Sequence, residues 1–179
     1  MKTEYEIRIL EIDHDKMVDK LEKLGAKKTM DALQERYIYD VIPKVEHKWI
    51  RLRTNGRDST LTIKDLKSKS IDGMKEIEIG VSDFYKTNEL LENLGYKSKG
   101  FQQNKRVQYI LDDVEIDLDK WPFIPEYMEI EGKDEDSVRK MLKTLDINSE
   151  QVTTMDVDSI YKHYGYETID NLRFDEEEL

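Results

Sequence analysis

The chain contains no cysteine among its 179 residues. Disulfide bonds and thiolate metal sites are therefore excluded, and nothing in the composition points to an oxidising compartment. The chain also lacks an apolar run long enough to span a membrane, and residues 1–4 lead directly into an alternating segment without an apolar signal region. We therefore expect a cytoplasmic protein that does not associate with a membrane.

Positive charge is in short supply. The sequence has 29 lysines and arginines against 40 aspartates and glutamates, which gives a formal net charge of −11. Because the nucleic-acid backbone attracts basic surfaces, this balance argues against a nucleic acid as partner. It does not exclude a small anionic ligand held by a local basic cluster.

The common motifs of phosphate binding and acyl transfer are missing as well. The sequence has no Walker loop, no dinucleotide-binding glycine pattern and no Gly-x-Ser-x-Gly elbow. The three histidines, His14, His47 and His163, are scattered without the spacing of metal ligands, so we assign them no role.

The composition nevertheless predicts a folded protein. Charged residues make up 39% of the chain and hydrophobic residues 37%, which is polar for a globular protein but too apolar for a disordered one. The length suits a single domain. We expect that domain to span residues 1–168, followed by an acidic C-terminal tail at 169–179 whose acidic run, 175–178, is solvated.

Eight segments alternate with a period of two and predict strands at 4–12, 33–41, 49–53, 60–66, 75–81, 104–111, 114–119 and 127–131. The pairs Asn55-Gly56 and Asp112-Asp113 lie between neighbouring segments, where tight hairpin turns are needed. Consecutive strands are therefore expected to be antiparallel.

Helical periodicity interrupts the strands. The expected elements are a helix capped by Asp13 and ended by Gly25, a helix capped by Ser82 and ended by Gly95, a helix capped by Asp134, and an amphipathic piece at 157–164. The apolar face of the second helix is expected to carry Phe84, Leu90, Leu91 and Leu94.

The chain also repeats itself. Residues 20–25 resemble residues 90–95, and residues 34–37 resemble residues 104–107, at a nearly constant separation. The repeat predicts two similar halves.

Most of the predicted strands carry charge on one face only. Side chains alternate along a strand, so Glu4, Glu6 and Arg8 share one face while Ile7 lies on the other. Such strands fit an open sheet with its charged face in water, or a closed barrel with its charged face inside. Acids are paired on four strands and bases are concentrated on others, which favours the barrel. The predicted fold is α+β: an eight-stranded antiparallel closed β-barrel with helices packed outside.

A barrel interior lined with both signs of charge requires ligands, because buried charges must be paired or must bind ions. Clustered carboxylates favour a hard divalent ion such as Mg²⁺ or Mn²⁺, which takes oxygen ligands. Arginines and lysines bind phosphate oxygens. A polyphosphate therefore suits both parts of such a site.

The ordered charged motifs resemble the CYTH family, the triphosphate tunnel metalloenzymes. The family opens on Glu-x-Glu-x-Lys, and this chain reads Glu4-Tyr5-Glu6-Ile7-Arg8; an Arg-x-Arg pair, a lone lysine and two further Glu-x-Glu pairs follow in order over residues 3–165. The resemblance implies an eight-stranded tunnel that uses Mg²⁺ or Mn²⁺ on a small triphosphate ligand: ATP, thiamine triphosphate or tripolyphosphate. Class IV adenylyl cyclases, thiamine triphosphatases and inorganic triphosphatases belong to this family, and residues 117–132 look closest to the cyclase branch.

The resemblance also implies roles for individual residues. The implied metal ligands are Glu4, Glu6, Asp119, Glu129 and Glu131. The implied triphosphate-binding residues are Arg8, Arg36, Arg51, Arg53, Lys64 and Arg106, and the remaining acids of the interior are Glu76, Glu78 and Asp117. Glu6 and Arg8 are the candidate catalytic residues.

Three questions stay open at the level of sequence. Arg8 stands where the motif has lysine, and an arginine stays protonated, so it can bind phosphate but cannot accept a proton. A protein that only binds or senses a nucleotide or polyphosphate is therefore the alternative to an enzyme. Trp49 and Trp121 could stack on a base, although Trp121 is expected to pack in a loop. Both a monomer and a homodimer are compatible with the sequence.

Overall fold

The computed structural model describes residues 1–167, 170–175 and 177. Its elements in chain order are β1 (Lys2–Ile9), α1 (His14–Lys23), β2 (Lys27–Asp40), β3 (Lys48–Thr54), β4 (Ser59–Leu66), β5 (Met74–Val81), α2 (Phe84–Asn93), β6 (Ser98–Leu111), β7 (Val114–Lys120), β8 (Tyr127–Gly132), α3 (Glu135–Thr144), the 3₁₀ turn η1 (Ser149–Gln151), β9 (Val152–Thr153) and α4 (Val157–His163). Among these described residues, no helix has the length and apolar character needed to cross a membrane.

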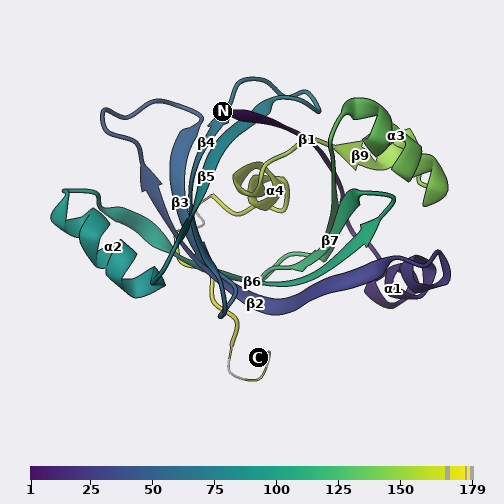
Figure 1. The fold of residues 1–179 in the computed structure, drawn as a ribbon, viewed down its shortest axis with the longest axis horizontal. Coiled ribbons are helices and arrows are strands. Elements are labelled where there is room, and N and C mark those ends of the chain that lie inside the picture. Colours follow the sequence, from purple (N-terminus) through teal and green to yellow (C-terminus); the bar gives the residue numbers. More distant parts are fainter. Residues whose placement is uncertain (168–169, 176, 178–179) are drawn as a thin grey trace.

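Eight strands close into a barrel. The strand order is β5-β4-β3-β2-β6-β7-β8-β1, and β1 pairs with β5 to complete the ring, while the short β9 pairs with β1. Every pairing within the ring is antiparallel. Figure 1 shows the ring, with α1, α2 and α3 outside its wall and α4 seen across its opening. The predicted fold is confirmed.

The predicted hairpin turns form as expected. In the turn between β3 and β4, the Asn55 side-chain oxygen accepts hydrogen bonds from the backbone N–H groups of Arg57 and Asp58, at 3.0 and 2.8 Å. Gly56 has φ +84°, a conformation that suits glycine. Between β6 and β7, Asp112 and Asp113 both have positive φ, the geometry of the tight turn that joins antiparallel strands.

Strands β2 and β6 are longer than their alternation predicted, because each begins about six residues earlier. They pair with each other along most of their length, from Lys27 opposite Ile110 to Tyr39 opposite Ser98. The pairing shifts register between Lys28 and Met30, and such a bulge breaks the period-two pattern in the sequence. The same pairing sets the two halves of the repeat against each other.

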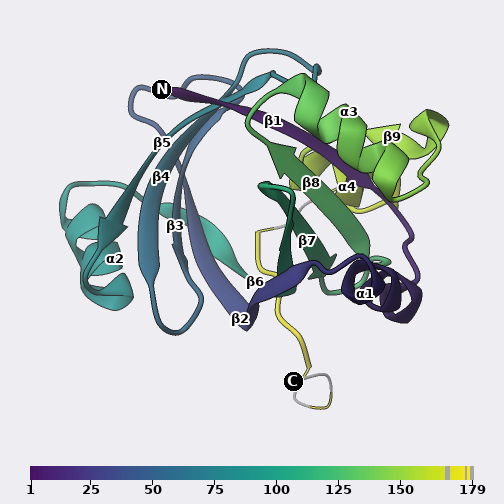
Figure 2. The ribbon, with the colours of Figure 1, turned by 45° about the vertical axis from the view of Figure 1, so that its right-hand side comes forward.

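The outer face of the barrel is apolar and helices cover much of it, while Ile77 and Ile79 on the outer face of β5 stay 50% and 56% exposed. Helices α1 and α3 pack on β1, β7 and β8 through a core that includes Leu21, Ile116, Met128 and Met141. Helix α2 packs with Phe84 and Leu91 against β2 and β3. Figure 2 shows α3 lying along β1 and β8. The charged faces of the strands are therefore turned to the interior.

The cap and apolar face predicted for α2 need correction. Asp83, not Ser82, caps the helix: its backbone is extended, and its carboxylate accepts a hydrogen bond from the Lys86 N–H at 2.9 Å. Phe84 and Leu91 lie two turns apart and define the buried face. Leu90 is one position off that face and stays 59% exposed, and Leu94, which ends the helix as its C-cap, stays 65% exposed. Asp13 and Asp134 cap α1 and α3 as predicted.

The segment after α4 returns to the barrel. β7 pairs with β6 from Lys105 onward, so no strand of the ring pairs with that edge of β6 before Lys105. There the Leu172 N–H donates to the Phe101 carbonyl at 3.0 Å, and the Gln103 N–H donates to the Leu172 carbonyl at 2.8 Å. Leu172 and Phe174 are buried. These contacts were not predicted from the sequence. The acidic run 175–178 lies in part outside the described residues. The domain boundary after residue 168 stays a prediction.

This contact predicts the effect of Gly100→Ala. A β-carbon on Gly100 would lie 1.4 Å from the Asp170 carbonyl oxygen, so the segment must move away from β6. We expect a loss of about 1–3 kcal/mol in the free energy of unfolding. Hydrogen exchange at the Leu172 and Gln103 amides should accelerate. Gly80→Ala is the control, since no atom lies within 4 Å of the added carbon there; unchanged exchange in Gly100→Ala would contradict the contact.

Candidate functional site

Charged and polar side chains from all eight strands of the ring face the barrel interior. The buried members are Glu4, Glu6, Arg8, Gln34, Arg36, Thr62, Lys64, Asn104, Arg106, Asp117 and Asp119. Arg51, Arg53, Glu76, Glu78, Glu129 and Glu131 line the same space and are partly exposed. The structure thus brings together every site residue named from the sequence, and their roles stay proposals.

Two arginines organise the carboxylates of β1, β7 and β8. The Arg8 guanidinium contacts Glu6 at 3.1 Å and also pairs with Glu129. Arg106 donates from Nε to Asp119 at 2.8 Å, pairs with Asp117, and lies 3.7 Å from Glu129. Burial works to raise the pKa of Glu129, but the two arginines outweigh it and hold that pKa at about 2.

A third cation serves the acids of β1 and β5. Lys64 Nζ lies 2.8 Å from Glu4 and 3.6 Å from Glu76. Arg8 is additionally fixed by its hydrogen bond to the Met155 carbonyl at 2.8 Å, just before α4. The arginine at the motif's lysine position is therefore a structural partner of the acids, and its surrounding carboxylates keep it protonated.

Several interior acids lie directly opposite one another on neighbouring strands. The register pairs Glu6 with Glu131, Glu131 with Glu115, and Asp117 with Glu129. Like charges in such positions destabilise a sheet. Burial together with neighbouring carboxylates raises the pKa of Glu131 and Glu115, and raises that of Asp117 to about 8.

This arrangement fits a divalent cation by its donor chemistry. The acidic part of the interior offers carboxylate oxygens, which Mg²⁺ and Mn²⁺ prefer, and its opposed acids would be relieved by added positive charge. Within the part of the chain that the structure describes, no three acids or histidines already form a ligand cluster. Binding would therefore require the acids to exchange contacts with Arg8, Lys64 or Arg106.

The opposite wall of the interior is basic. Arg36 on β2 lies directly across from Arg53 on β3, and Arg51 follows two residues away on the same face. Arg51 and Arg53 share the Glu78 carboxylate, at 3.3 Å and 3.8 Å. Burial and the neighbouring arginines lower the pKa of Arg53 to about 10, and they lower that of Arg36 as well.

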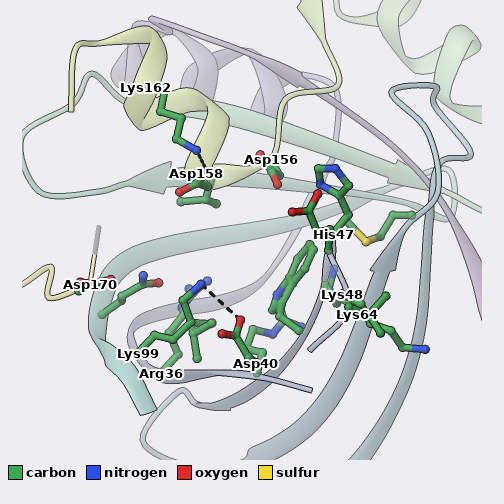
Figure 3. Close-up of a pocket in the computed structure, with 18 of the residues that line it drawn as sticks. Arg36, Asp40, His47, Lys48, Lys64, Lys99, Asp156, Asp158, Lys162 and Asp170 are labelled. Carbon is green, nitrogen blue, oxygen red and sulfur yellow. Dashed lines mark hydrogen bonds and ion pairs between the residues drawn. The ribbon is translucent and has the colours of Figure 1, made fainter. Parts of the chain in front are cut away.

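A cavity of about 570 Å³ reaches this basic wall. Its inner lining includes Arg8, Arg36, Arg51 and Lys64. The lining also includes Trp121, further residues of β2, β3, β5 and β6, the loop between β2 and β3, α4 with its N-cap, and the segment around Asp170. In Figure 3, Asp156, Asp158 and Lys162 face the cavity from α4, while Arg36, Asp40 and Lys99 lie on its far side.

The uncharged side chains of the site were not predicted from the sequence. Gln34 precedes Arg36 by two residues, Asn104 precedes Arg106, and Tyr127 precedes Glu129, so each shares the inward face of its strand. The same alternation placed Glu115 inside, where it was not assigned a role. Trp121 packs with Tyr161 as expected for a loop residue, and it also lines the cavity. The sequence signal that could have identified these residues is their position on the charged face of each predicted strand.

Comparisons with known proteins agree with this fold. The CYTH domain model matches residues 2–155. A relative from Methanocaldococcus jannaschii, "Putative adenylate cyclase MJ0240", is 25% identical over 162 residues, which cover 83% of this chain and 93% of the relative. The PH1012 protein from Pyrococcus horikoshii has a TM-score of 0.75 at 23% identity, covering 88% of this chain and 98% of that one. "Putative adenylyl cyclase HpAC1" from Hippeastrum has a TM-score of 0.61 at 13% identity, covering 93% and 97%.

The opposed acids predict a pH-dependent effect of Glu115→Gln. The raised pKa means that ionising Glu115 costs stability as the pH rises above its usual value of 4.5. Removing the charge should therefore raise the unfolding temperature at about pH 8 and change it little at about pH 4. Thermal unfolding of parent and variant at both pH values measures this. Glu22→Gln, on the exposed side of α1, is the control; equal shifts at both pH values would contradict the account.

Proposed function

The chain belongs to the CYTH domain family, and from that premise we propose that it is a metal-dependent enzyme acting on a triphosphate bound inside the barrel. The observation that carries the proposal is the separation of charge across one enclosed space. Arg36, Arg51 and Arg53 line one wall, where Glu78 pairs with Arg51 and Arg53 and, among the described residues, no carboxylate pairs with Arg36. The opposite wall is rich in carboxylates. A polyphosphate with a divalent ion has the complementary charge for both walls.

The basic wall is suited to hold the phosphate groups. Guanidinium groups bind phosphate oxygens through paired hydrogen bonds, and Arg36, Arg51 and Arg53 can present three of them from adjacent strands. Lys64 adds a compact charge from β4. Arg8 and Arg106, which contact carboxylates, can bind phosphate if those acids turn toward a cation.

The acidic wall is suited to hold Mg²⁺ or Mn²⁺. Glu129 and Glu131 lie two residues apart on the inward face of β8, and Glu6 lies opposite Glu131 on β1. Glu4 and Asp119 are the further candidate ligands. When bound, the ion would neutralise charge on the phosphate oxygens and on the leaving group. Between the two walls, the triphosphate would be held with its phosphate groups against the arginines and its metal ion against the acids.

Two reactions are compatible with this geometry. In a cyclase, the ribose 3′-oxygen of ATP attacks the α-phosphorus, the bond to the bridging oxygen breaks, and pyrophosphate leaves with cyclic AMP as the other product. In a triphosphatase, the oxygen of water attacks the terminal phosphorus, the bond from that phosphorus to the bridging oxygen breaks, and phosphate and the remaining diphosphate are the products. The name of the M. jannaschii relative supports the first reaction, and the dominant triphosphatase activity described for the Hippeastrum protein supports the second.

One observation favours a second candidate function, a protein that binds or senses a nucleotide or polyphosphate without turnover. Arg8 is buried and is held by Glu6, Glu129 and the Met155 carbonyl. A protonated guanidinium in that position cannot accept a proton from the attacking hydroxyl or water. In the enzyme, Glu6 would take that role.

Turnover assays separate the candidates. ATP, thiamine triphosphate and tripolyphosphate, each with Mg²⁺ or with Mn²⁺, would be incubated with the protein, and cyclic AMP, pyrophosphate and phosphate would be measured. Metal-dependent product from at least one substrate supports the enzyme. Tight binding of a triphosphate without product supports the sensor, and failure to bind any of the three contradicts both.

The basic wall predicts how Arg53→Ala behaves. Arg53 is proposed to contact phosphate and not the attached group. Its loss should therefore weaken the binding of ATP and of tripolyphosphate alike, by about 10- to 100-fold. Calorimetric titration of both ligands measures this. Arg57→Ala removes the same charge from the exposed turn after β3 and should leave both affinities unchanged. Binding of AMP as tight as that of ATP would show that the attached group provides the affinity instead.

The acidic wall predicts how Glu131→Gln behaves. Loss of one anionic oxygen ligand should weaken Mn²⁺ binding by about tenfold or more, as measured by calorimetry. Glu89→Gln on the exposed side of α2 is the matched control. If Glu131→Gln and Glu129→Gln both bound Mn²⁺ like the parent, neither residue would belong to the metal site.

A further inference from the structure

Arg36 is surrounded differently from the other buried arginines of the interior. Arg8 contacts two carboxylates, and Arg106 lies within reach of three. Arg36 is only 5% exposed, yet among the described residues no carboxylate forms an ion pair with it. It is thus a buried cation without a counter-charge in contact, at a position that lines the cavity.

Neutral groups hold the Arg36 side chain instead. Its Nη2 donates to the Gln34 side-chain oxygen at 3.2 Å and to the Asn104 side-chain oxygen. Its guanidinium carbon lies 4.5 Å above the centre of the Trp121 ring. Amide oxygens and an aromatic face attract a cation but carry no net charge, so they orient the guanidinium without neutralising it. Within the described part of the chain, its Nε has no hydrogen-bond partner.

Asn104 has a second contact that fixes its orientation. Its side-chain nitrogen donates to Asp119 Oδ1 at 2.9 Å, while its oxygen faces Arg36. A guanidinium only donates and a carboxylate only accepts, so an amide is the group that satisfies both. The Asn104 side chain thus lies between Arg36 and Asp119, and Asp119 is itself paired with Arg106. An aspartate at position 104 would be of equal size and would form an ion pair with Arg36.

We propose that Asn104 is a positioning residue that, with Gln34 and Trp121, holds Arg36 fixed but unneutralised, so that a phosphate group of the ligand provides the missing counter-charge. The inference rests on the proposed function, since it concerns the same cavity. Burying an unpaired charge is costly, and the incoming anion removes that cost. The neutrality of position 104 therefore contributes to phosphate affinity, although Asn104 itself need not touch the ligand.

The direct test is the affinity of Asn104→Asp for tripolyphosphate, measured by calorimetry without divalent ions. The added carboxylate should neutralise Arg36 and weaken binding by about 10- to 100-fold. Gln34→Glu supplies the same charge from the other side of Arg36 without facing Asp119, and it should also weaken binding. Asn93→Asp makes the identical change on the exposed end of α2 and should bind like the parent. Circular dichroism checks that each variant folds. If Asn104→Asp does not fold, the affinity of Gln34→Glu for tripolyphosphate is the test.

A double-mutant cycle separates positioning from a general effect on the fold. Once Arg36→Gln has removed the cation, Asn104→Asp has nothing to neutralise, so the double variant should bind like Arg36→Gln alone. Losses that add in the double variant overturn the inference. So does binding within about twofold of the parent by folded Asn104→Asp and Gln34→Glu, and in that case the proposed function still stands. Failure of the parent protein to bind tripolyphosphate overturns this inference. The proposed function fails with it only if ATP and thiamine triphosphate also do not bind in the presence of Mg²⁺ or Mn²⁺.

Discussion

Charges of both signs are enclosed in a barrel whose outer face is apolar, and burying them is costly unless each finds a counter-charge. Closure of the ring by the β1–β5 pairing creates this situation, because it turns the charged face of every strand inward while helices cover much of the apolar face. The arrangement of the interior follows from how that cost is met. Where acids and bases alternate, as around Arg106, the protein neutralises itself.

The compensation is incomplete at both walls, and in opposite senses. Of the three arginines on one wall, two share Glu78 and the third, Arg36, pairs with no carboxylate among the described residues. On the other wall, acids face acids across the β1–β8 and β7–β8 ladders. Ligands that carry both signs of charge would complete each wall, which is the physical reason for proposing a triphosphate together with a divalent ion. The cavity lining joins this interior to α4 and to the segment around Asp170, so access to the arginines depends on what covers that end.

Much of this could be predicted from sequence, since a period of two with charge on one face specifies both the strands and the side that faces inward. The bulge near Lys28 interrupts the alternation, so the start of β2 was not predicted. Asp83 and not Ser82 caps α2, because the choice between two neighbouring capping residues depends on a backbone conformation that the sequence does not show. Cross-strand register is not visible in sequence either. The closeness of Arg36 to Arg53, and the neutral contact of Asn104, depend on that register.

The central claim is that one wall binds phosphate and the other binds the metal. A crystal structure of the protein with tripolyphosphate and Mn²⁺, with anomalous scattering to locate manganese, tests it most directly. The account predicts phosphate oxygens within hydrogen-bond distance of Arg36, Arg51 and Arg53, and an anomalous peak coordinated by Glu129 or Glu131. Phosphate bound outside the barrel, or manganese confined to surface carboxylates while the interior ion pairs stay unchanged, would contradict it.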